Sequence, residues 1–491
     1  MEKINSWLKN KIKNFLLILI KKLDDSDVYS PNLRLSNNNI FKKEIKIKPV
    51  VTGIISYCLL FFMIVSQLGI TYKNFIFVFI FLSIIFLLVI FYFTDQEKEN
   101  IKNSNVVMLM CFITIISFLF FQILLHSVSM IAFPISAFAV LLSLLISIKF
   151  SLVYIMVMVT FMLMVNGFHA ALPIMHVASA LVALVNIRQI HSRSQFSKIG
   201  VKVFVVMLGM LIIFHILGFF EVQSVELSLW FAMLNAFMSV LIILAALPLL
   251  EMLFSRTTNI KLVELSDFNS PLLKRLMVEA PGTYHHSLMA ASLAEQAAAA
   301  IGANSLLTRT GAYYHDIGKL KNPEYFIENQ NKNENPHDNL SPSMSGLVLI
   351  SHVKDGVALA RKYKIDEVVI DFIRQHHGTS LIQYFYFRAL ENSKDVNEQD
   401  FRYPGSKPTS KETAILMIAD SIEAISRTIP DKSAGKLKEL VEKVINNKFT
   451  DGQFSDCSIT LNDLAKIADS MTATLCGIYH ARIDYKKAEE E

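Results

Sequence analysis

The chain has 491 residues, of which 53% are hydrophobic, and its mean hydropathy is +0.43. This composition excludes an ordinary soluble protein, because the apolar residues, 36 Phe among them, gather in long uncharged runs of the kind that cross membranes. The formal net charge of +5 comes from residues 1–49, which hold 11 Lys or Arg against 5 Asp or Glu. The rest of the chain has no basic excess, so nucleic-acid binding is disfavoured.

Residues 1–49 are expected to form a basic segment on the cytoplasmic side, where Lys and Arg attract anionic lipid. Within this segment, WLKNKIKNFLLILIKK (residues 7–22) predicts an amphipathic helix that lies on the bilayer. A disordered basic tail is an equally good interpretation of the same residues.

Eight apolar segments predict a membrane domain of about eight helices over residues 50–250, since roughly 20 apolar residues cross the hydrocarbon core. The segments are 50–70, 74–94, 105–125, 128–148, 152–168, 172–187, 201–220 and 228–250. If the N-terminus is cytoplasmic, the basic residues concentrate in the inside loops, and the acidic residues of the outside loops are Glu221 and Glu226. This distribution follows the positive-inside rule and returns the chain to the cytoplasm after Leu250.

Few polar residues interrupt these spans, and their interiors contain no Asp, Glu, Lys or Arg. They are Asn166, His169, His176, His215 and Asn235. We interpret them as packing or interhelical hydrogen-bonding residues, because no embedded charge indicates an ion or proton path. A transporter is therefore disfavoured.

Beyond the spans the composition becomes that of a helical bundle with little strand-like alternation. Residues 251–280 are expected to be a helical linker, in which Ser270 caps a helix that begins at Pro271. A further helix ends at Gly302. The predicted fold class is all-α, with a polytopic membrane bundle followed by a cytoplasmic helical domain.

The stretch GAYYHDIGKL (residues 311–320) places His315 beside Asp316, with Lys319 one helical turn further on. An imidazole and a carboxylate side by side form a typical pair of metal ligands. A second pair, His337-Asp338, lies in the polar stretch NKNENPHDNLSPS and is interpreted as a chance occurrence.

Further candidate metal ligands recur along the predicted bundle. The set is His286, His315, Asp316, His352, His376, His377 and Asp420. Taken singly, each is better explained as a satisfied core residue, but five imidazoles and two carboxylates together exceed one metal and suit two, with Asp316 bridging. Mixed nitrogen and oxygen donors without thiolate suit Mn or Fe as well as Zn. Two metals about 3.5–4 Å apart would suit in-line phosphodiester hydrolysis.

These stretches, together with PGTYHHSLMAASLAEQAA, FIENQ, SHVKDG, QHHGTSLIQYFYF and FRYPGSKP, resemble the seven-transmembrane HD-domain phosphodiesterases, bacterial membrane enzymes that hydrolyse cyclic di-AMP. The resemblance runs from about residue 74 to the end and makes 281–491 an HD-type metal phosphohydrolase domain. It implies two metal sites that share Asp316. One takes His286, His315 and Asp420, and the other takes His352, His376 and His377.

The resemblance also implies a catalytic role for Asp316 and Lys319, with Lys319 near the phosphate. A solvated helix-end lysine is the alternative for Lys319. Arg402 is expected to contact phosphate and Tyr403 to stack on a base, although a structural turn explains their motif equally well. The family usually carries a large extracytoplasmic domain between its first two membrane helices. Here only TYKN separates Ile70 from Phe75, which leaves regulation through such a domain in doubt.

The resulting expectation is an enzyme of the bacterial inner membrane that opens cyclic di-AMP to linear 5′-pApA with two divalent metal ions, Fe or Mn being favoured. The membrane domain would tune the rate. The alternatives are another cyclic dinucleotide or nucleotide as substrate, or a membrane receptor whose HD domain binds nucleotide without hydrolysis. A homodimer is left open.

Overall fold

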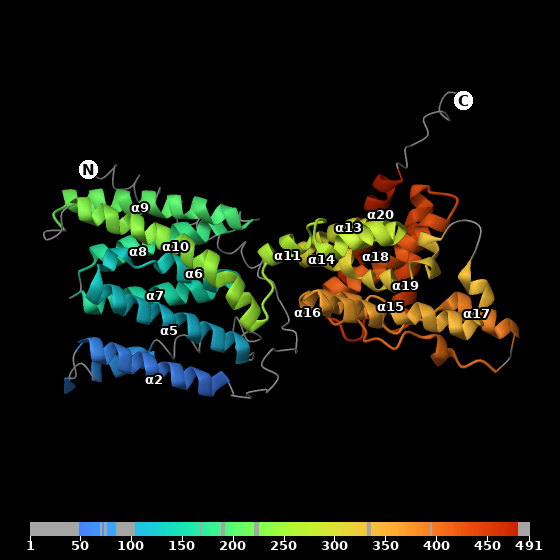
Figure 1. The fold of residues 1–491 in the computed structure, drawn as a ribbon, viewed down its shortest axis with the longest axis horizontal. Coiled ribbons are helices and arrows are strands. Elements are labelled where there is room, and N and C mark those ends of the chain that lie inside the picture. Colours follow the sequence, from blue (N-terminus) through green and yellow to red (C-terminus); the bar gives the residue numbers. More distant parts are fainter. Residues whose placement is uncertain are drawn as a thin grey trace, which may run out of the picture. The chain divides into compact units, whose positions relative to one another are not determined.

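The computed structural model describes residues 49–68, 71–72, 76–84, 104–166, 169–187, 192–219, 225–330, 335–392 and 395–479. These residues are helical or irregular and contain no strand, apart from one isolated bridge between Leu381 and Arg402, so the all-α prediction is confirmed for them. The described chain divides between Ile260 and Lys261 into two compact units (Figure 1). The predicted amphipathic segment lies outside the described residues.

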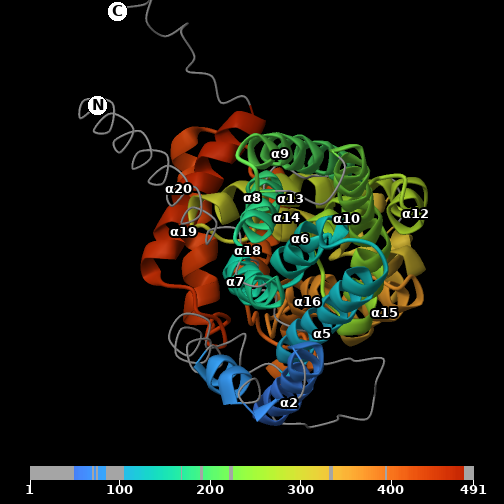
Figure 2. The same ribbon diagram turned by 90° about the vertical axis from the view of Figure 1, so that its left-hand side faces the viewer.

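The first unit consists of apolar helices that lie side by side (Figure 1) and are seen nearly end-on in Figure 2. They are α2 (Pro49–Leu68), α5 (Ser104–Ser127), η2 (Met130–Ala132), α6 (Ile135–Leu145), α7 (Ile148–Val165), α8 (Ala171–Ile187), η3 (Arg193–Gln195), α9 (Phe196–Ile216) and α10 (Val225–Phe254). The predicted span 74–94 is described as helix only at residues 76–84. Helices α5, α7, α9 and α10 are each long and apolar enough to cross a membrane.

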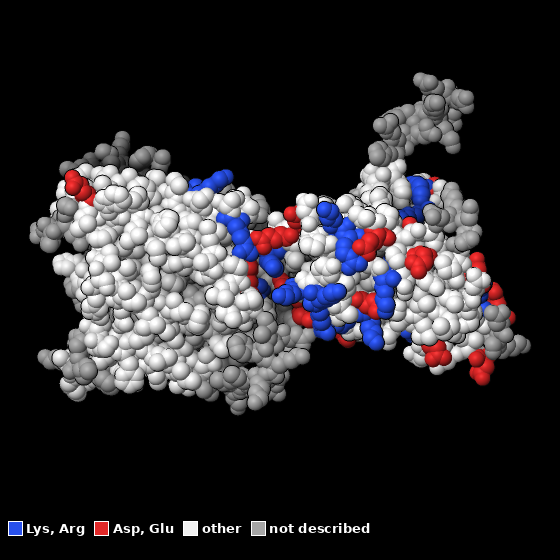
Figure 3. Space-filling model, in the orientation of Figure 1, with Lys and Arg blue, Asp and Glu red and all other residues white. Residues whose placement is uncertain are grey.

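The surface of this unit is apolar as well as its core. Large side chains such as Met156, Trp230 and Phe237 are exposed, and the face shown in Figure 3 carries almost no charged residue. In water such a surface would be a large exposed apolar patch, whereas lipid tails solvate it without cost. The prediction of a membrane domain agrees with both observations.

The predicted single helix over 128–148 is wrong, because the chain breaks at Phe133 and Pro134 between η2 and α6. Helix α6 has 11 residues, about 16 Å, and is too short to cross a bilayer by itself. The Asn235 side chain on α10 donates to the carbonyl oxygens of Ile131 (2.9 Å) and Phe133 (2.6 Å). Its interpretation as an interhelical hydrogen-bonding residue is confirmed, and the broken backbone is tolerated because it is buried in protein.

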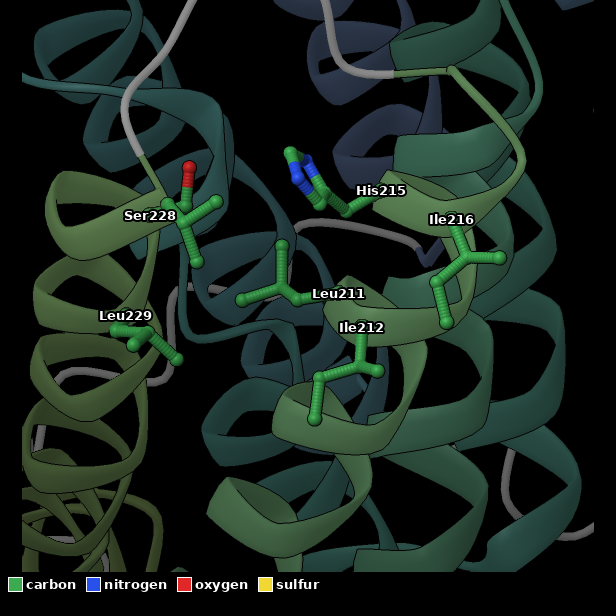
Figure 4. Close-up of a pocket in the computed structure, with 7 residues that line it drawn as sticks. Leu211, Ile212, His215, Ile216, Ser228 and Leu229 are labelled. Carbon is green, nitrogen blue, oxygen red and sulfur yellow. The ribbon is translucent and has the colours of Figure 1, made fainter.

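A small pocket lies between α9 and α10 (Figure 4). Its lining consists of Leu211, Ile212, His215, Ile216, Val225, Ser228 and Leu229. The imidazole of His215 and the hydroxyl of Ser228 lie toward one end of the pocket, and aliphatic side chains line the rest. None of the lining residues is Asp, Glu, Lys or Arg, which agrees with the weak case for a transporter.

The segment 251–280, predicted as a helical linker, is not one helix. Helix α10 continues past the predicted boundary to Phe254, and the backbone then turns at Ser255, whose φ is +50°. Two short helices follow, α11 (Asn259–Leu265) and α12 (Pro271–Glu279). Pro271 occupies the first turn of α12 after the cap residue Ser270, as predicted.

The second unit is a helical bundle whose central helices span Pro281–Ala300 and Lys411–Thr428. Its remaining elements are α13 (Pro281–Ala300), α14 (Ser305–Tyr314), η4 (Ile317–Lys321), η5 (Pro323–Tyr325), η6 (Ile327–Asn329), η7 (Pro336–Asn339), α15 (Pro342–Lys362), α16 (Glu367–Gln375), α17 (Gln383–Asn392), η8 (Glu398–Phe401), α18 (Lys411–Thr428), α19 (Ala434–Thr450) and α20 (Leu461–Ile478). The alanines of α13 let α18 approach closely, and residues 413–420 of α18 are buried without interruption. Gly302 follows α13 with φ +69°, as its predicted role in ending that helix requires.

Candidate metal centre

The second unit brings all seven predicted metal ligands to one place. Their ligand atoms form two groups, and within each group the atoms lie within 4.8 Å of one another. One group is His286, His315, Asp316 and Asp420, and the other is Asp316, His352, His376 and His377. Asp316 belongs to both groups. The division is the one that the family pattern implies.

The two pairs of adjacent ligands, His315-Asp316 and His376-His377, lie at the C-terminal ends of helices. His315 lies at the C-terminal cap of α14, and Asp316 precedes η4. His376 likewise caps α16, and His377 follows it into a tight turn. Gly378 closes that turn with φ +53°, and a side chain there would also collide with Gln453. Adjacent residues at a helix end can therefore both face the cluster, which adjacent residues within one helix cannot do.

Hydrogen bonds determine which nitrogen of each ring faces the cluster. The Nδ1–H groups of His315, His352 and His376 each donate to the carbonyl oxygen three residues earlier, at 2.7, 2.5 and 2.9 Å. A carbonyl oxygen can only accept, so the proton of each neutral ring is on Nδ1 and the lone pair is on Nε2. Backbone partners of this kind typically orient metal-binding histidines.

The polar atoms inside the cluster are poorly satisfied by protein alone. Among the described residues, His315 Nε2 and Asp316 Oδ1 are buried and have no hydrogen-bond partner. His352 Nε2 lies 3.2 Å from His376 Nε2, so two lone pairs face each other unless one ring is charged. Each buried unsatisfied group costs about 1–3 kcal/mol. A pair of divalent cations would satisfy these atoms at once, so the donor set fits a dinuclear metal site.

The two groups differ in the effect that their surroundings have on the pKa values of their histidines. At His286 the carboxylates of Asp420 and Glu423 outweigh burial and raise the pKa to about 9. At His315, Asp316 and Asp420 do the same and raise the pKa to about 10. This group therefore holds protons at neutral pH when no metal is bound.

At two histidines of the second group burial dominates. It lowers the pKa of His352 to about 4, against the opposing effect of Asp316. Burial, followed by the neighbouring His376, also holds the pKa of His377 well below its usual value. The pKa of the shared carboxyl of Asp316 lies well below its usual range, because His315 and other cations nearby outweigh its burial. His352 and His377 are therefore neutral at neutral pH, and Asp316 is a carboxylate.

Glu423, which the sequence analysis did not identify, supports His286. Its Oε2 lies 2.5 Å from His286 Nδ1, while His286 Nε2 lies 2.9 Å from Asp420 Oδ1. Arg427 binds the other oxygen of Glu423 from one turn away. The only signal in the sequence is that Glu423 follows Asp420 by three residues on α18, which places both on one face.

We expect Glu423→Gln to weaken metal binding about 10- to 100-fold, the usual effect of losing a second carboxylate that orients a metal-binding histidine. The measurement is the Mn²⁺ dissociation constant of the full chain by isothermal titration calorimetry. Glu442→Gln, an exposed residue on α19 paired only with Lys438, is the matched control. Equal Mn²⁺ affinities for both variants would show that Glu423 does not position His286.

Lys319 is not the solvated helix-end lysine that was considered as an alternative. Its side chain is only 12% exposed, and its Nζ lies 2.7 Å from both Asp316 Oδ2 and Glu328 Oε1. Burial alone would lower the pKa of Lys319, but the two carboxylates outweigh it and raise it. Glu328, a second residue that the sequence analysis missed, also accepts from the Thr283 hydroxyl at 3.0 Å.

The guanidinium group of Arg402 is bound by other residues of the protein. Its guanidinium binds Glu398 Oε1 (2.7 Å), Asp451 Oδ1 (3.0 Å) and the carbonyl oxygen of Thr379 (2.8 Å). This geometry favours the structural alternative, and phosphate contact by Arg402 stays a prediction. Tyr403 does border the cluster, with its ring stacked on His377 at a centroid distance of 4.2 Å.

The second His-Asp pair lies apart from both ligand groups, as predicted. His337 bonds to the carbonyl oxygen of Tyr325 at 2.9 Å. The Asp338 side chain is 66% exposed and 4.0 Å from Arg388. Neither residue belongs to a group that could hold a metal ion among the described residues.

Two families match separate parts of the chain. The HD domain matches residues 283–425, and the 7TM receptor with intracellular HD hydrolase matches residues 72–258. The first match contains all seven members of the cluster, and the second contains most of the apolar helices.

The chain is also similar to curated and solved proteins. It is 40% identical over 331 residues to the cyclic-di-AMP phosphodiesterase PgpH of Bacillus subtilis. The aligned region covers 66% of this chain and 46% of that protein. It is 47% identical over 262 residues to PgpH of Listeria monocytogenes, covering 53% and 36%. The chain thus matches less than half the length of either relative. A crystal structure of the L. monocytogenes PgpH HD domain in complex with cyclic di-AMP is 48% identical, with a TM-score of 0.43, and covers 44% of this chain and 100% of that one.

Proposed function

We propose that the chain is one of the 7TM receptors with an intracellular HD hydrolase, and that it is a metal-dependent phosphodiesterase that hydrolyses cyclic di-AMP to linear 5′-pApA. The observation that carries this proposal is the pair of ligand groups that share Asp316. The cyclic-di-AMP phosphodiesterases among its relatives supply the substrate. The basic inside loops support a cytoplasmic HD domain at the bacterial inner membrane.

The proposed ligands are His286, His315 and Asp420 for one cation and His352, His376 and His377 for the other, with Asp316 between them. Two divalent cations at such a site supply Lewis acidity toward a phosphoryl oxygen and lower the pKa of water. Oxygen and nitrogen donors without thiolate favour Mn or Fe in this role.

The protein's own residues supply orientation and charge. Glu423 and the backbone carbonyls hold the imidazoles with one nitrogen turned inward. Lys319 keeps its proton and stabilises the carboxylate form of Asp316. From this position Lys319 would contact a phosphate oxygen of the substrate. Tyr403, stacked on His377, would offer its ring to an adenine at the edge of the site.

A nucleotide receptor without hydrolysis is the alternative from another class. A binding-only HD domain would be expected to have lost Asp316 or Asp420, yet both are present and buried within the cluster. Another cyclic dinucleotide remains the closer alternative, because the metal centre itself does not select a base.

The test is hydrolysis by the full chain in lipid nanodiscs, supplied with Mn²⁺, or with Fe²⁺ under anaerobic conditions. Cyclic di-AMP, cyclic di-GMP and cyclic GMP–AMP are offered in parallel, and products are identified by mass spectrometry. Selective formation of pApA is expected. Cleavage of another dinucleotide would correct the substrate, while binding of cyclic di-AMP without cleavage by the metal-loaded chain would establish the receptor.

Metal affinity should depend on pH more steeply at the ligand group of His286 and His315 than at the other group. Because the pKa values of metal-free His286 and His315 are raised to about 9 and about 10, a cation must displace their protons. Below these pKa values its affinity should rise about tenfold per pH unit for each displaced proton. His352, whose pKa is lowered to about 4, has no proton to lose. Mn²⁺ titrations at pH 6, 7 and 8 should show a steeper pH dependence at the site of His286 and His315, and two equal pH dependences would contradict this.

A further inference from the structure

Lys448, near the end of α19, reaches the turn that carries His377. Its Nζ donates to Ser380 Oγ at 2.9 Å. The backbone N–H of Ser380 donates to the carbonyl oxygen of His377 (3.0 Å), and its carbonyl oxygen accepts from the N–H of Tyr403 (3.1 Å). Ser380 thus connects the ammonium group of Lys448 to the backbone of both His377 and Tyr403, whose rings stack on each other at the second ligand group.

The end of α19 is held firmly against this turn. Gln453 accepts from the backbone N–H of Thr379 and donates to its hydroxyl, both at 3.0 Å. Asp451 is bound by Arg402 and by the Gln453 amide. These contacts fix the backbone on both sides of the Lys448–Ser380 hydrogen bond, so the position of the lysine is built into the fold.

Lys448 is a partly buried cation without an ion pair. Among the described residues no carboxylate oxygen lies within 4.0 Å of its Nζ, and its neighbour Asp451 is engaged by Arg402. Burial lowers the pKa of Lys448, against the opposing effect of Asp420 and Asp451. A desolvated cation beside a phosphodiesterase centre favours an anionic partner that the protein does not itself supply.

Arg402 cannot take this role in the same geometry, because protein groups already occupy its guanidinium. Lysine is also well suited to it, since an ammonium group binds phosphate as a compact point charge with three donors. Of its three N–H donors, the structure assigns one to Ser380 and leaves the others for a ligand.

We propose that Lys448 is a substrate-binding residue whose ammonium group contacts a phosphate oxygen of the cyclic dinucleotide, on the side of His377 and Tyr403. The inference rests on the proposed function, because it requires a phosphodiester at the metal centre. The proposal makes the end of α19 a part of the active site, although none of the seven metal-ligand candidates lies on α19.

The test compares Lys448→Met with Lys443→Met, an exposed lysine of the same helix that loses the same charge. Both full-length variants are loaded with Mn²⁺ in nanodiscs and assayed for pApA formation. For Lys448→Met we expect kcat/KM to fall about 10- to 100-fold, as for loss of a charged donor to a reacting phosphate. Metal content and Tm should equal those of Lys443→Met, and Lys448→Arg should recover part of the activity.

Two outcomes would overturn the proposal. One is equal kcat/KM for Lys448→Met and Lys443→Met. The other is that Lys448→Met loses activity in proportion to its loss of metal or its lower Tm, and that Lys448→Arg does not recover the activity. That result would mean that Lys448 only stabilises the fold. Binding of inorganic phosphate to the Mn²⁺-loaded chains separates this failure from failure of the proposed function. If the wild type cuts no cyclic di-AMP, weaker phosphate binding by Lys448→Met alone still supports the contact, and equal phosphate binding overturns it.

Discussion

Replacing Asp316 with Asn is expected to abolish hydrolysis and to remove at least one metal ion per chain. The two carboxylate oxygens of Asp316 face different ligand groups. Its Oδ1 lies 3.4 Å from His352 Nε2, and its Oδ2 lies 3.2 Å from His315 Nε2. An amide would turn an N–H₂ donor toward one group or the other, where a cation requires a lone pair. Because two cations bound by these groups would act as a unit, we expect activity to fall about 10³-fold or more.

The measurement pairs the rate of pApA formation with the metal content determined by elemental mass spectrometry. Asp338→Asn is the matched control, because it makes the same change in the other His-Asp pair, at an exposed side chain outside the cluster. Its activity and metal content should equal those of the wild type. Two bound ions and undiminished activity in Asp316→Asn would disprove the shared-carboxylate arrangement.

The second large effect is expected from Gly318→Ala, although Gly318 is not a ligand. It lies in η4, two residues after Asp316, and a Cβ there would be 1.8 Å from the carbonyl oxygen of His352 and 2.6 Å from the N of Gly356. These are backbone atoms of α15, so the conflict can be relieved only by moving η4 and α15 apart. Such a movement would separate Asp316 from His352.

We expect Gly318→Ala to lower the free energy of unfolding by about 3 kcal/mol or more, since overpacking against backbone exceeds the usual cost of an extra methyl. A displacement of about 1 Å at the metal centre would reduce activity about 100-fold. Thermal unfolding, Mn²⁺ stoichiometry and the rate of pApA formation are measured together.

Gly477→Ala on α20 is the control for Gly318→Ala, because a Cβ there meets nothing within 4 Å and alanine favours a helix. It should be neutral or slightly stabilising. If Gly318→Ala behaves in the same way, the contact between η4 and α15 does not hold the two ligand groups together.

Much of the candidate site could be predicted from the sequence because its ligands are chemically distinctive and occur in short motifs. His315-Asp316 and His376-His377 are adjacent in the chain, and both pairs lie at helix ends, where the backbone can turn two neighbouring side chains toward one point. The apolar spans were predictable because their length and lack of charge follow from the thickness of the bilayer alone.

The residues that support the site could not be predicted in the same way. Glu423, Glu328 and Lys448 are ordinary charged residues in sequence. Glu423 and Lys448 acquire their roles from partners that are distant along the chain, and Glu328 acquires its role from Lys319, nine residues away. The same reason applies to Arg402, because its motif does not reveal the ion pair that its guanidinium makes with Asp451. Charged side chains on helices are usually solvated, so only burial and proximity distinguish these residues.

The sequence by itself determined that the chain is helical, that its first part is a membrane domain and that its second part carries seven metal-ligand side chains, because periodicity, apolar length and donor chemistry are local properties. Only the tertiary structure decided that η2 and α6 form a broken element held by Asn235, that the seven side chains meet as two groups around Asp316, and that Lys319 and Lys448 lie beside them. These features depend on which helices pack together, and that packing is set by contacts between residues far apart in the chain.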